Sequence, residues 1–188
     1  IVTFLKKEYK MKIISFLSVL LFLVSIIGQS VSAKNYDKEP YKAPEFTHTL
    51  ASEWINSPPL TMNALKGKVI LIDVWTFGCW NCYRSFPWLN SLEKKYQSKG
   101  LKIIGVHTPE FDHEKVRKNI ISKTKEFNLH HPIMMDNNFS YWRSLNNRYW
   151  PTFYLIDKEG NIVYSHVGET HDGDSRALAL EKKLIQLL

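Results

Sequence analysis

Two cysteines, Cys79 and Cys82, lie three residues apart and are the only cysteines in this sequence of 188 residues. They belong to the stretch TFGCWNCYRSFP, in which aromatic residues surround the pair and Pro87 follows five residues after Cys82. Two thiols at this spacing can form a reversible disulfide, supply half of a zinc site, or act as a structural link. The surrounding sequence has to decide between these three kinds of chemistry.

Neither a zinc site nor a structural link fits the sequence well. The second half of a four-ligand zinc site would be another cysteine pair, which is absent, and His166 and His171 follow more than 80 residues later. A disulfide across four residues closes a small loop, which is worth about 2 kcal/mol against about 4.7 kcal/mol for a 100-residue loop. We therefore expect no metal, and no cofactor beyond a redox-active disulfide between Cys79 and Cys82.

The position of the pair favours redox chemistry. Residues 69–75, VILIDVW, are almost continuously apolar and β-branched, which predicts a strand buried on both faces. Residues 83–99 predict a helix, so Cys79 should lie between the strand and the first helical turn. There the unpaired backbone N–H groups and the helix dipole favour a thiolate, which is the nucleophile. Cys82, one turn along, should be more buried and should resolve the mixed disulfide.

The remaining sequence predicts the elements that hold this pair in place. Strands are expected at 101–107, 132–136, 152–157 and 162–167, and helices at 112–127, 139–145 and 175–188. Strands that alternate with helices, followed by a hairpin, predict an α/β fold. Its architecture is a central mixed β-sheet flanked by helices on both faces.

The first 33 residues predict a secretory signal peptide. Met11 and Lys12 precede an apolar run over 13–27, and Val31-Ser32-Ala33 gives a small-x-small ending. The run is shorter than the roughly 20 residues that span a bilayer, which favours cleavage over an uncleaved membrane anchor. We interpret Met11 as the start residue, with residues 1–10 as upstream read-through or an alternative start.

Composition changes after this segment. Residues 34–45, KNYDKEPYKAPE, are polar and predict a linker, and residues 46–188 predict the folded domain. Residues 1–33 contribute +3 of the formal net charge of +7, which leaves +4 for residues 34–188. The lysines of that part are scattered among acidic residues, so we expect no nucleic-acid partner. We expect an extracytoplasmic protein, periplasmic or tethered, that meets the membrane only through an uncleaved N-terminal segment.

Several stretches of this sequence resemble the thioredoxin superfamily. The stretch IDVWTFGCWNC, with the later Pro87, carries the first similarity. Within the superfamily the sequence is most similar to exported TlpA/ResA-like thiol–disulfide oxidoreductases and to the thioredoxin-like extracytoplasmic domain of DipZ-type proteins. The phrases that carry this are WINSPPLT, LKGKVILIDVWTFGCWNC, GLKIIGVHTPEF, LNNRYWPTFYLID and GNIVYSHVGE, which follow in order over residues 54–169. The resemblance implies a thioredoxin-like fold that exchanges disulfides.

The resemblance also implies roles for single residues. Cys79 corresponds to the attacking cysteine and Cys82 to the resolving one. Asp73 corresponds to a buried acid beneath the pair, and a raised pKa would suit it to shuttling the proton of Cys82. Glu110, in VHTPE, corresponds to a glutamate near the disulfide that tunes the pKa of the thiols. His107, close to it in sequence, could titrate near neutral pH.

A substrate-binding surface follows from the same comparison. Pro151 corresponds to the cis-proline of the superfamily, whose loop faces the thiols. Trp150 stands before it, where the superfamily usually has Thr, Ser, Val or Ile. Together with Phe77 and Trp80, Trp150 could line a shallow cleft for an extended peptide.

These residues predict an exported thiol–disulfide oxidoreductase that reduces protein disulfides, in cytochrome c maturation or envelope redox homeostasis. Because the sequence has a single long apolar segment, a membrane electron carrier of the CcdA/DsbD type would be a separate protein. One alternative is a thiol peroxidase, since Thr76 and Cys79 match part of the peroxiredoxin pattern, although Ile72 replaces its proline. The other alternative is a non-catalytic binding module.

Overall fold

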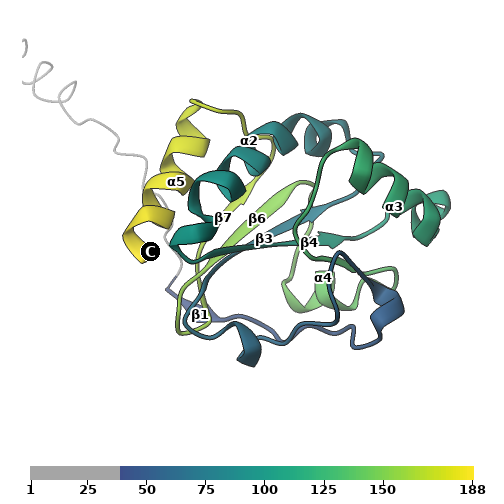
Figure 1. Cartoon of the computed structure of the whole chain (residues 1–188), viewed down its shortest axis with the longest axis horizontal. Coiled ribbons are helices and arrows are strands. Elements are labelled where there is room, and N and C mark those ends of the chain that lie inside the picture. The colour runs from purple at the N-terminus through teal and green to yellow at the C-terminus, as the bar shows by residue number, and fades with distance from the viewer. Residues whose placement is uncertain (1–38) are drawn as a thin grey trace, which may run out of the picture. The chain divides into compact units, whose positions relative to one another are not determined.

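Seven strands form one mixed sheet in the computed structural model, which describes residues 39–188 (Figure 1). The strands are β1 Tyr41–Lys42, β2 Trp54–Ile55, β3 Val69–Trp75, β4 Leu101–His107, β5 Ile133–Met135, β6 Thr152–Ile156 and β7 Asn161–Val167. The helices are α2 Trp80–Tyr96, α3 Arg117–Glu126, α4 Ser140–Ser144 and α5 Ser175–Leu187. Short 3₁₀ helices are η1 Ala51–Glu53, η2 Asn63–Leu65, η3 Gln97–Lys99 and η4 Asp112–Lys115. The predicted signal peptide, residues 1–33, lies outside the described residues.

The order of the strands is β1-β7-β6-β3-β4-β5-β2, which places β3 in the centre. This strand runs parallel to β4 and antiparallel to β6, and all seven of its residues are buried. Residues that alternate along β3 therefore enter two different cores, as the continuous apolar run predicted.

One core lies under α2, α3 and α5, and the other lies against α4. Leu71 and Trp75 of β3 join the first core, together with Leu89 of α2. Ile72 joins the second core, together with Tyr141 of α4. In Figure 1, α2 and α5 cover the upper face of the sheet and α4 lies below it. The predicted mixed sheet with helices on both faces is confirmed.

Helix α2 begins at Trp80, three residues earlier than the sequence predicted, and continues through Pro87. Cys79 is its N-cap, and the Cys79 sulfur accepts a hydrogen bond from the backbone N–H of Cys82. Sulfur is not among the usual capping atoms, so sequence reasoning did not extend the helix this far. At the other end, η3 closes on Gly100, whose φ of 107° suits glycine.

The region predicted as one helix over 112–127 consists of two pieces. Helix η4 ends at Lys115, and α3 starts at Arg117 after Val116, whose backbone is extended. The interruption allows the side chain of Glu114 to turn inward, where it is fully buried.

The folded part of the chain begins before the predicted boundary at residue 46. Tyr41 and Lys42 pair with the start of β7, and the backbone N–H of Ala43 donates to the Gly160 carbonyl at 3.0 Å. The predicted linker over 34–45 is therefore too long at its C-terminal end. A two-residue edge strand has no periodicity by which the sequence could reveal it.

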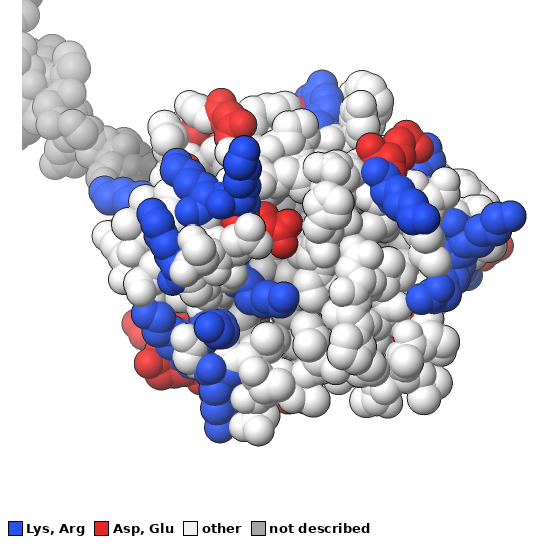
Figure 2. Space-filling model, in the orientation of Figure 1, with Lys and Arg blue, Asp and Glu red and all other residues white. Residues whose placement is uncertain are grey.

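Charged side chains are mixed in sign on the surface. On the face in Figure 2, Lys and Arg lie in separate groups, several of them beside acidic side chains. Ion pairs such as Lys95 with Glu181 and Lys123 with Glu126 show the same mixing. Within residues 39–188, none of the helices is both long enough and apolar enough to span a membrane.

Candidate active site

The two cysteines form a disulfide at the junction of β3 and α2, with 5.3 Å between their Cα atoms. Cys79 is partly exposed, whereas Cys82 is fully buried in the core under α2. The backbone N–H of Cys82 donates to the Cys79 sulfur at 3.2 Å. The predicted difference in burial is therefore confirmed, and it leaves the first sulfur open to attack and the second protected.

A carboxylate holds the turn that leads into Cys79. The backbone N–H of Gly78 donates to Glu114 Oε1 at 2.7 Å. The N–H groups of Glu110 and Phe111 donate to Glu114 Oε2 at 2.6 and 2.9 Å. Burial alone would raise the pKa of Glu114, but these backbone donors outweigh it and lower the pKa below its usual value. Glu114 is thus a buried negative charge next to the cysteine turn.

The structure brings Glu114, not the predicted Glu110, to this turn. The side chain of Glu110 is exposed, and only its backbone N–H takes part in the network around Glu114. Sequence reasoning missed Glu114, although one signal was available. It lies three residues after Phe111, the N-cap of η4, and accepts the N–H of that cap as capping glutamates do. A direct role for Glu110 stays a prediction.

Asp73 lies on the face of β3 that α2 covers, between Leu71 and Trp75. It pairs with Gly105 of β4 and is almost completely buried. Neither of its carboxyl oxygens has a hydrogen-bond partner among the described residues. Burial raises its pKa to about 8. Asp73 is therefore protonated at neutral pH and can exchange a proton just above it.

The peptide bond between Trp150 and Pro151 is cis, as the resemblance implied. Because Thr152 pairs with Val74, this bond lies beside the end of β3, where the cysteine turn begins. The indole N–H of Trp150 donates to the Thr108 carbonyl at 3.0 Å. The turn, the loop after β4 and the proline loop thus meet at one end of the sheet.

The aromatic residues predicted to form a cleft lie in different surroundings. Phe77 is half-buried and stacks on His107, with ring centroids 5.6 Å apart. Trp80 is 64% exposed and stacks on Tyr83, with centroids 5.1 Å apart. Trp150 packs on Trp142 at 4.3 Å. Their shared role in peptide binding stays a prediction.

His107 does not titrate near neutral pH, so that expectation is wrong. Its side chain is fully buried, and burial lowers its pKa to about 4. It is therefore a neutral ring at pH 7.

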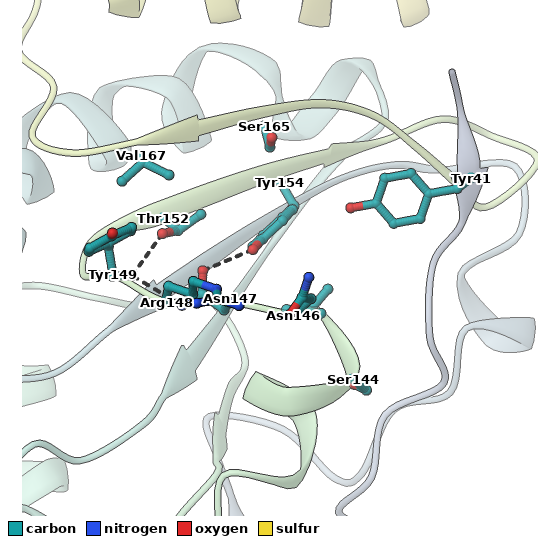
Figure 3. A pocket seen from close by; sticks show the side chains of 11 residues that line it. Tyr41, Ser144, Asn146, Asn147, Arg148, Tyr149, Thr152, Tyr154, Ser165 and Val167 are labelled. Carbon is teal, nitrogen blue, oxygen red and sulfur yellow. Dashed lines mark hydrogen bonds between the residues drawn. The ribbon is translucent and has the colours of Figure 1, made fainter. Parts of the chain in front are cut away.

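A polar pocket lies on the other side of the proline loop (Figure 3). Its volume is about 520 Å³, and Arg148, Tyr149 and Tyr154 are among the residues that line it. Within it, the Tyr154 hydroxyl donates to Asn147 Oδ1 at 2.8 Å, one of the dashed lines in Figure 3. Tyr154 belongs to the core on the α4 side, so this pocket opens away from Cys82. Among residues 39–188, no three His, Cys, Asp or Glu side chains gather as a metal site would require.

The model of the Redoxin family matches residues 38–180, which include the sheet and the disulfide. This chain belongs to the Redoxin family. Protein DipZ of Mycobacterium tuberculosis is 41% identical over 119 residues, which are 62% of this chain and 17% of that protein. NHL repeat-containing protein 2 of Homo sapiens is 36% identical over 150 residues, which are 78% of this chain and 20% of that protein. The Redoxin-family chain thus spans a fifth or less of these two relatives.

Shorter relatives match this Redoxin-family chain along most of their length. Thiol-disulfide oxidoreductase ResA of Bacillus cereus is 27% identical over 152 residues, which are 80% of this chain and 85% of that protein. Among solved structures, a putative thiol:disulfide interchange protein DsbE from Chlorobium tepidum has a TM-score of 0.67 at 22% identity, covering 80% of this chain and 97% of that one. A thioredoxin-like protein in its oxidized form has a TM-score of 0.67 at 27% identity, covering 79% and 95%. The fold of this Redoxin-family chain is therefore thioredoxin-like.

Proposed function

We propose that this protein is an extracytoplasmic thiol–disulfide oxidoreductase that reduces disulfides of exported proteins through Cys79 and Cys82. The observation that carries the proposal is the arrangement of the two sulfurs at the start of α2. Cys79 is accessible and caps the helix, and Cys82 is buried directly behind it. The names of the ResA and DsbE relatives support the same reaction class.

The reaction transfers two electrons from the cysteine pair to the substrate. The Cys79 thiolate attacks one sulfur of a substrate disulfide, which forms a mixed disulfide and releases the first substrate thiolate. Cys82 then loses its proton and attacks the Cys79 sulfur. This step breaks the mixed disulfide, releases the second substrate thiolate and leaves the Cys79–Cys82 disulfide. Two protons from the protein or solvent complete the substrate dithiol.

Asp73 is the residue we propose to accept the proton of Cys82. Its raised pKa of about 8 places it close to the ordinary pKa of a thiol, so that proton transfer between them is nearly balanced. It lies on the face of the sheet that α2 covers, where Cys82 is buried. No other acidic side chain of β3 is available for this step.

The cellular role is part of the proposal. The signal peptide predicted over residues 1–33 supports export, and the ResA resemblance supports reduction in cytochrome c maturation or envelope redox homeostasis. A separate membrane electron carrier of the CcdA/DsbD type would then return the Cys79–Cys82 disulfide to the dithiol. Its electrons replace the two that each turnover transfers to substrate.

The test uses the reduced full chain with a disulfide-bonded peptide as substrate. We expect the wild type to reduce the peptide, Cys79→Ser to be inactive, and Cys82→Ser to accumulate a mixed disulfide at Cys79 that mass spectrometry detects. Retained activity in Cys79→Ser would overturn the mechanism. If the wild type leaves the disulfide intact but consumes hydrogen peroxide, the thiol peroxidase replaces our proposal.

The direction of electron transfer has a test of its own. Equilibration of the pair with glutathione or dithiothreitol buffers gives its reduction potential. A value near that of thioredoxin, about −270 mV, would support a reductase. A value near −120 mV, typical of strong exported oxidants, would instead make the protein a disulfide donor.

A further inference from the structure

The hydrogen bonds of Glu114 occupy the backbone donor nearest to Cys79 on its N-terminal side. Gly78, the residue directly before Cys79, gives its N–H to Glu114 Oε1. The Cys79 sulfur is left with one backbone donor in the described structure, the N–H of Cys82. The carboxylate thus competes with the nucleophile for the donors at the start of α2.

The contact between Glu114 and the turn is as close as two residues allow. A Cβ atom placed on Gly78 would lie 2.3 Å from Glu114 Oε1 and 3.4 Å from its carboxyl carbon. Glycine at position 78 is what lets the carboxylate reach the turn. The negative charge therefore lies against the residue next to the nucleophile, in a site with no exposure to solvent.

Nearby titratable groups leave this charge largely uncompensated. From β3, Asp73 is neutral at pH 7, and from β4, His107 is neutral as well. From η4, His113 makes ring contacts with Phe77 and Phe111. On α2, Arg84 is engaged in an ion pair with Glu169.

We propose that Glu114 is a positioning residue that fixes the turn before Cys79 and, by its buried negative charge, disfavours the Cys79 thiolate. This inference rests on the proposed function of the pair. Thiolate formation stabilises the reduced form of a cysteine pair, so a charge that opposes the thiolate shifts the equilibrium toward the disulfide. Glu114 thereby makes the protein a stronger reductant than the start of α2 alone would make it.

The test compares Glu114→Gln with Glu110→Gln, which removes the same charge from an exposed side chain four residues away. In Glu114→Gln, the amide oxygen can keep the donors Glu110 and Phe111, and the NH₂ group then faces Gly78. The readouts are the pH dependence of iodoacetamide alkylation of Cys79, in a Cys82→Ser background, and the glutathione equilibrium of the intact pair. Folding of each variant is checked by thermal unfolding.

We expect Glu114→Gln to lower the pKa of Cys79 by about one unit and to shift the glutathione equilibrium about tenfold toward the dithiol. Glu110→Gln should leave both unchanged. A folded Glu114→Gln with wild-type values would overturn the inference, as would an equal effect of Glu110→Gln. Alkylation requires no disulfide substrate, so failure of the wild type to reduce peptides would count against the proposed function alone.

A second measurement needs no variant and decides the matter if Glu114→Gln does not fold. The ¹³C signal of the Glu114 carboxylate is followed by NMR across the titration of Cys79 in the reduced wild type. The oxidised wild type, in which no thiol titrates, is the control. We expect a step in the reduced protein alone, at the pKa of Cys79. A signal that ignores the thiol titration would overturn the inference.

Discussion

Trp150 donates its indole N–H to the carbonyl of Thr108, across the gap between the proline loop and the loop after β4. Thr108 in turn donates its backbone N–H to the carbonyl of Trp75 at 3.0 Å, at the end of β3. The loop that contains the cis bond is therefore tied through two hydrogen bonds to the strand that carries the cysteine turn. A side chain that is large and exposed enough to meet substrate is also part of the support of the site.

Replacing Trp150 by Phe should separate these two contributions. The change keeps an aromatic ring beside Trp142 and removes the hydrogen bond to Thr108. We expect a loss of about 1 kcal/mol in the free energy of unfolding, measured with urea. We also expect slower reduction of a peptide disulfide, with little change for a small disulfide such as oxidised glutathione. Trp142→Phe is the matched control, because no hydrogen bond of its indole is found in residues 39–188. Equal effects of the two variants would refute this role of the indole N–H.

Asp73 should make the stability of the protein fall as pH rises. Its folded pKa of about 8 lies above the ordinary value of about 3.9, so the folded state holds the proton that the unfolded state loses. The contribution is fully present below pH 4 and is lost as pH rises toward 8. Urea unfolding should show Asp73→Asn becoming more stable than wild type across that range, by a few kcal/mol at pH 8. A constant difference between the two proteins would contradict the raised pKa.

The same substitution should change the exchange reaction. In the wild type, the rate at which Cys82 releases the mixed disulfide should rise as pH passes through about 8, because Asp73 becomes able to accept a proton. Asp73→Asn should lack this inflection and react more slowly above it. Stopped-flow fluorescence of the release step gives both profiles. An inflection that persists in Asp73→Asn would assign it to another group.

His48 joins the N-terminal segment to the end of β5. Its Nδ1 lies 2.9 Å from Glu53 Oε1, and its Nε2 lies 3.0 Å from Asp136 Oδ1. The hydrogen bond with Asp136 is the main reason that its pKa is raised, against the opposing effect of burial. Stability from the charged ring is therefore complete below pH 6.5 and is lost as pH rises through the higher folded value.

His48→Gln should accordingly cost most at low pH. We expect a loss of about 1–3 kcal/mol in the free energy of unfolding at pH 6, and a smaller loss at pH 9. His130→Gln provides the control, because that histidine is exposed and bonds only to the nearby Asn128. If the cost of His48→Gln grows with pH, the ring is not charged in the folded protein.

Gly105 has no room for a side chain. A Cβ there would lie 2.9 Å from Trp75 Nε1 and 3.1 Å from Ile133 Cγ1, both buried. Gly105→Ala should therefore lower the free energy of unfolding by about 1–3 kcal/mol through overpacking. Urea unfolding measures the loss directly. Unchanged stability would mean that the indole of Trp75 moves without cost.

The central fold could be predicted because its signals are local and strong. The run VILIDVW has no polar interruption except Asp73, and β3 is buried throughout its length. Gly100, which ends the first predicted helix region, has the positive φ that glycine tolerates. By contrast, β1 and β2 contain two residues each, which is too short for any periodic pattern.

The site was predictable where the residue type carries the chemistry. The spacing of Cys79 and Cys82 indicates a reversible disulfide, and an acid within an apolar strand indicates a raised pKa. Glu114 was missed because its partners are backbone N–H groups, and every residue except proline has one. The neutrality of His107 depends on tertiary burial, which a short stretch of sequence does not reveal.

The fit of Gly78 against Glu114 also bears on how such sequences can diverge. A side chain at position 78 and a carboxylate at position 114 would occupy the same space. Neither residue can change freely while the other stays, so the two positions form a coevolving pair. A natural variant that gains a side chain at 78 should have surrendered its glutamate at 114, and with it the brake on the thiolate.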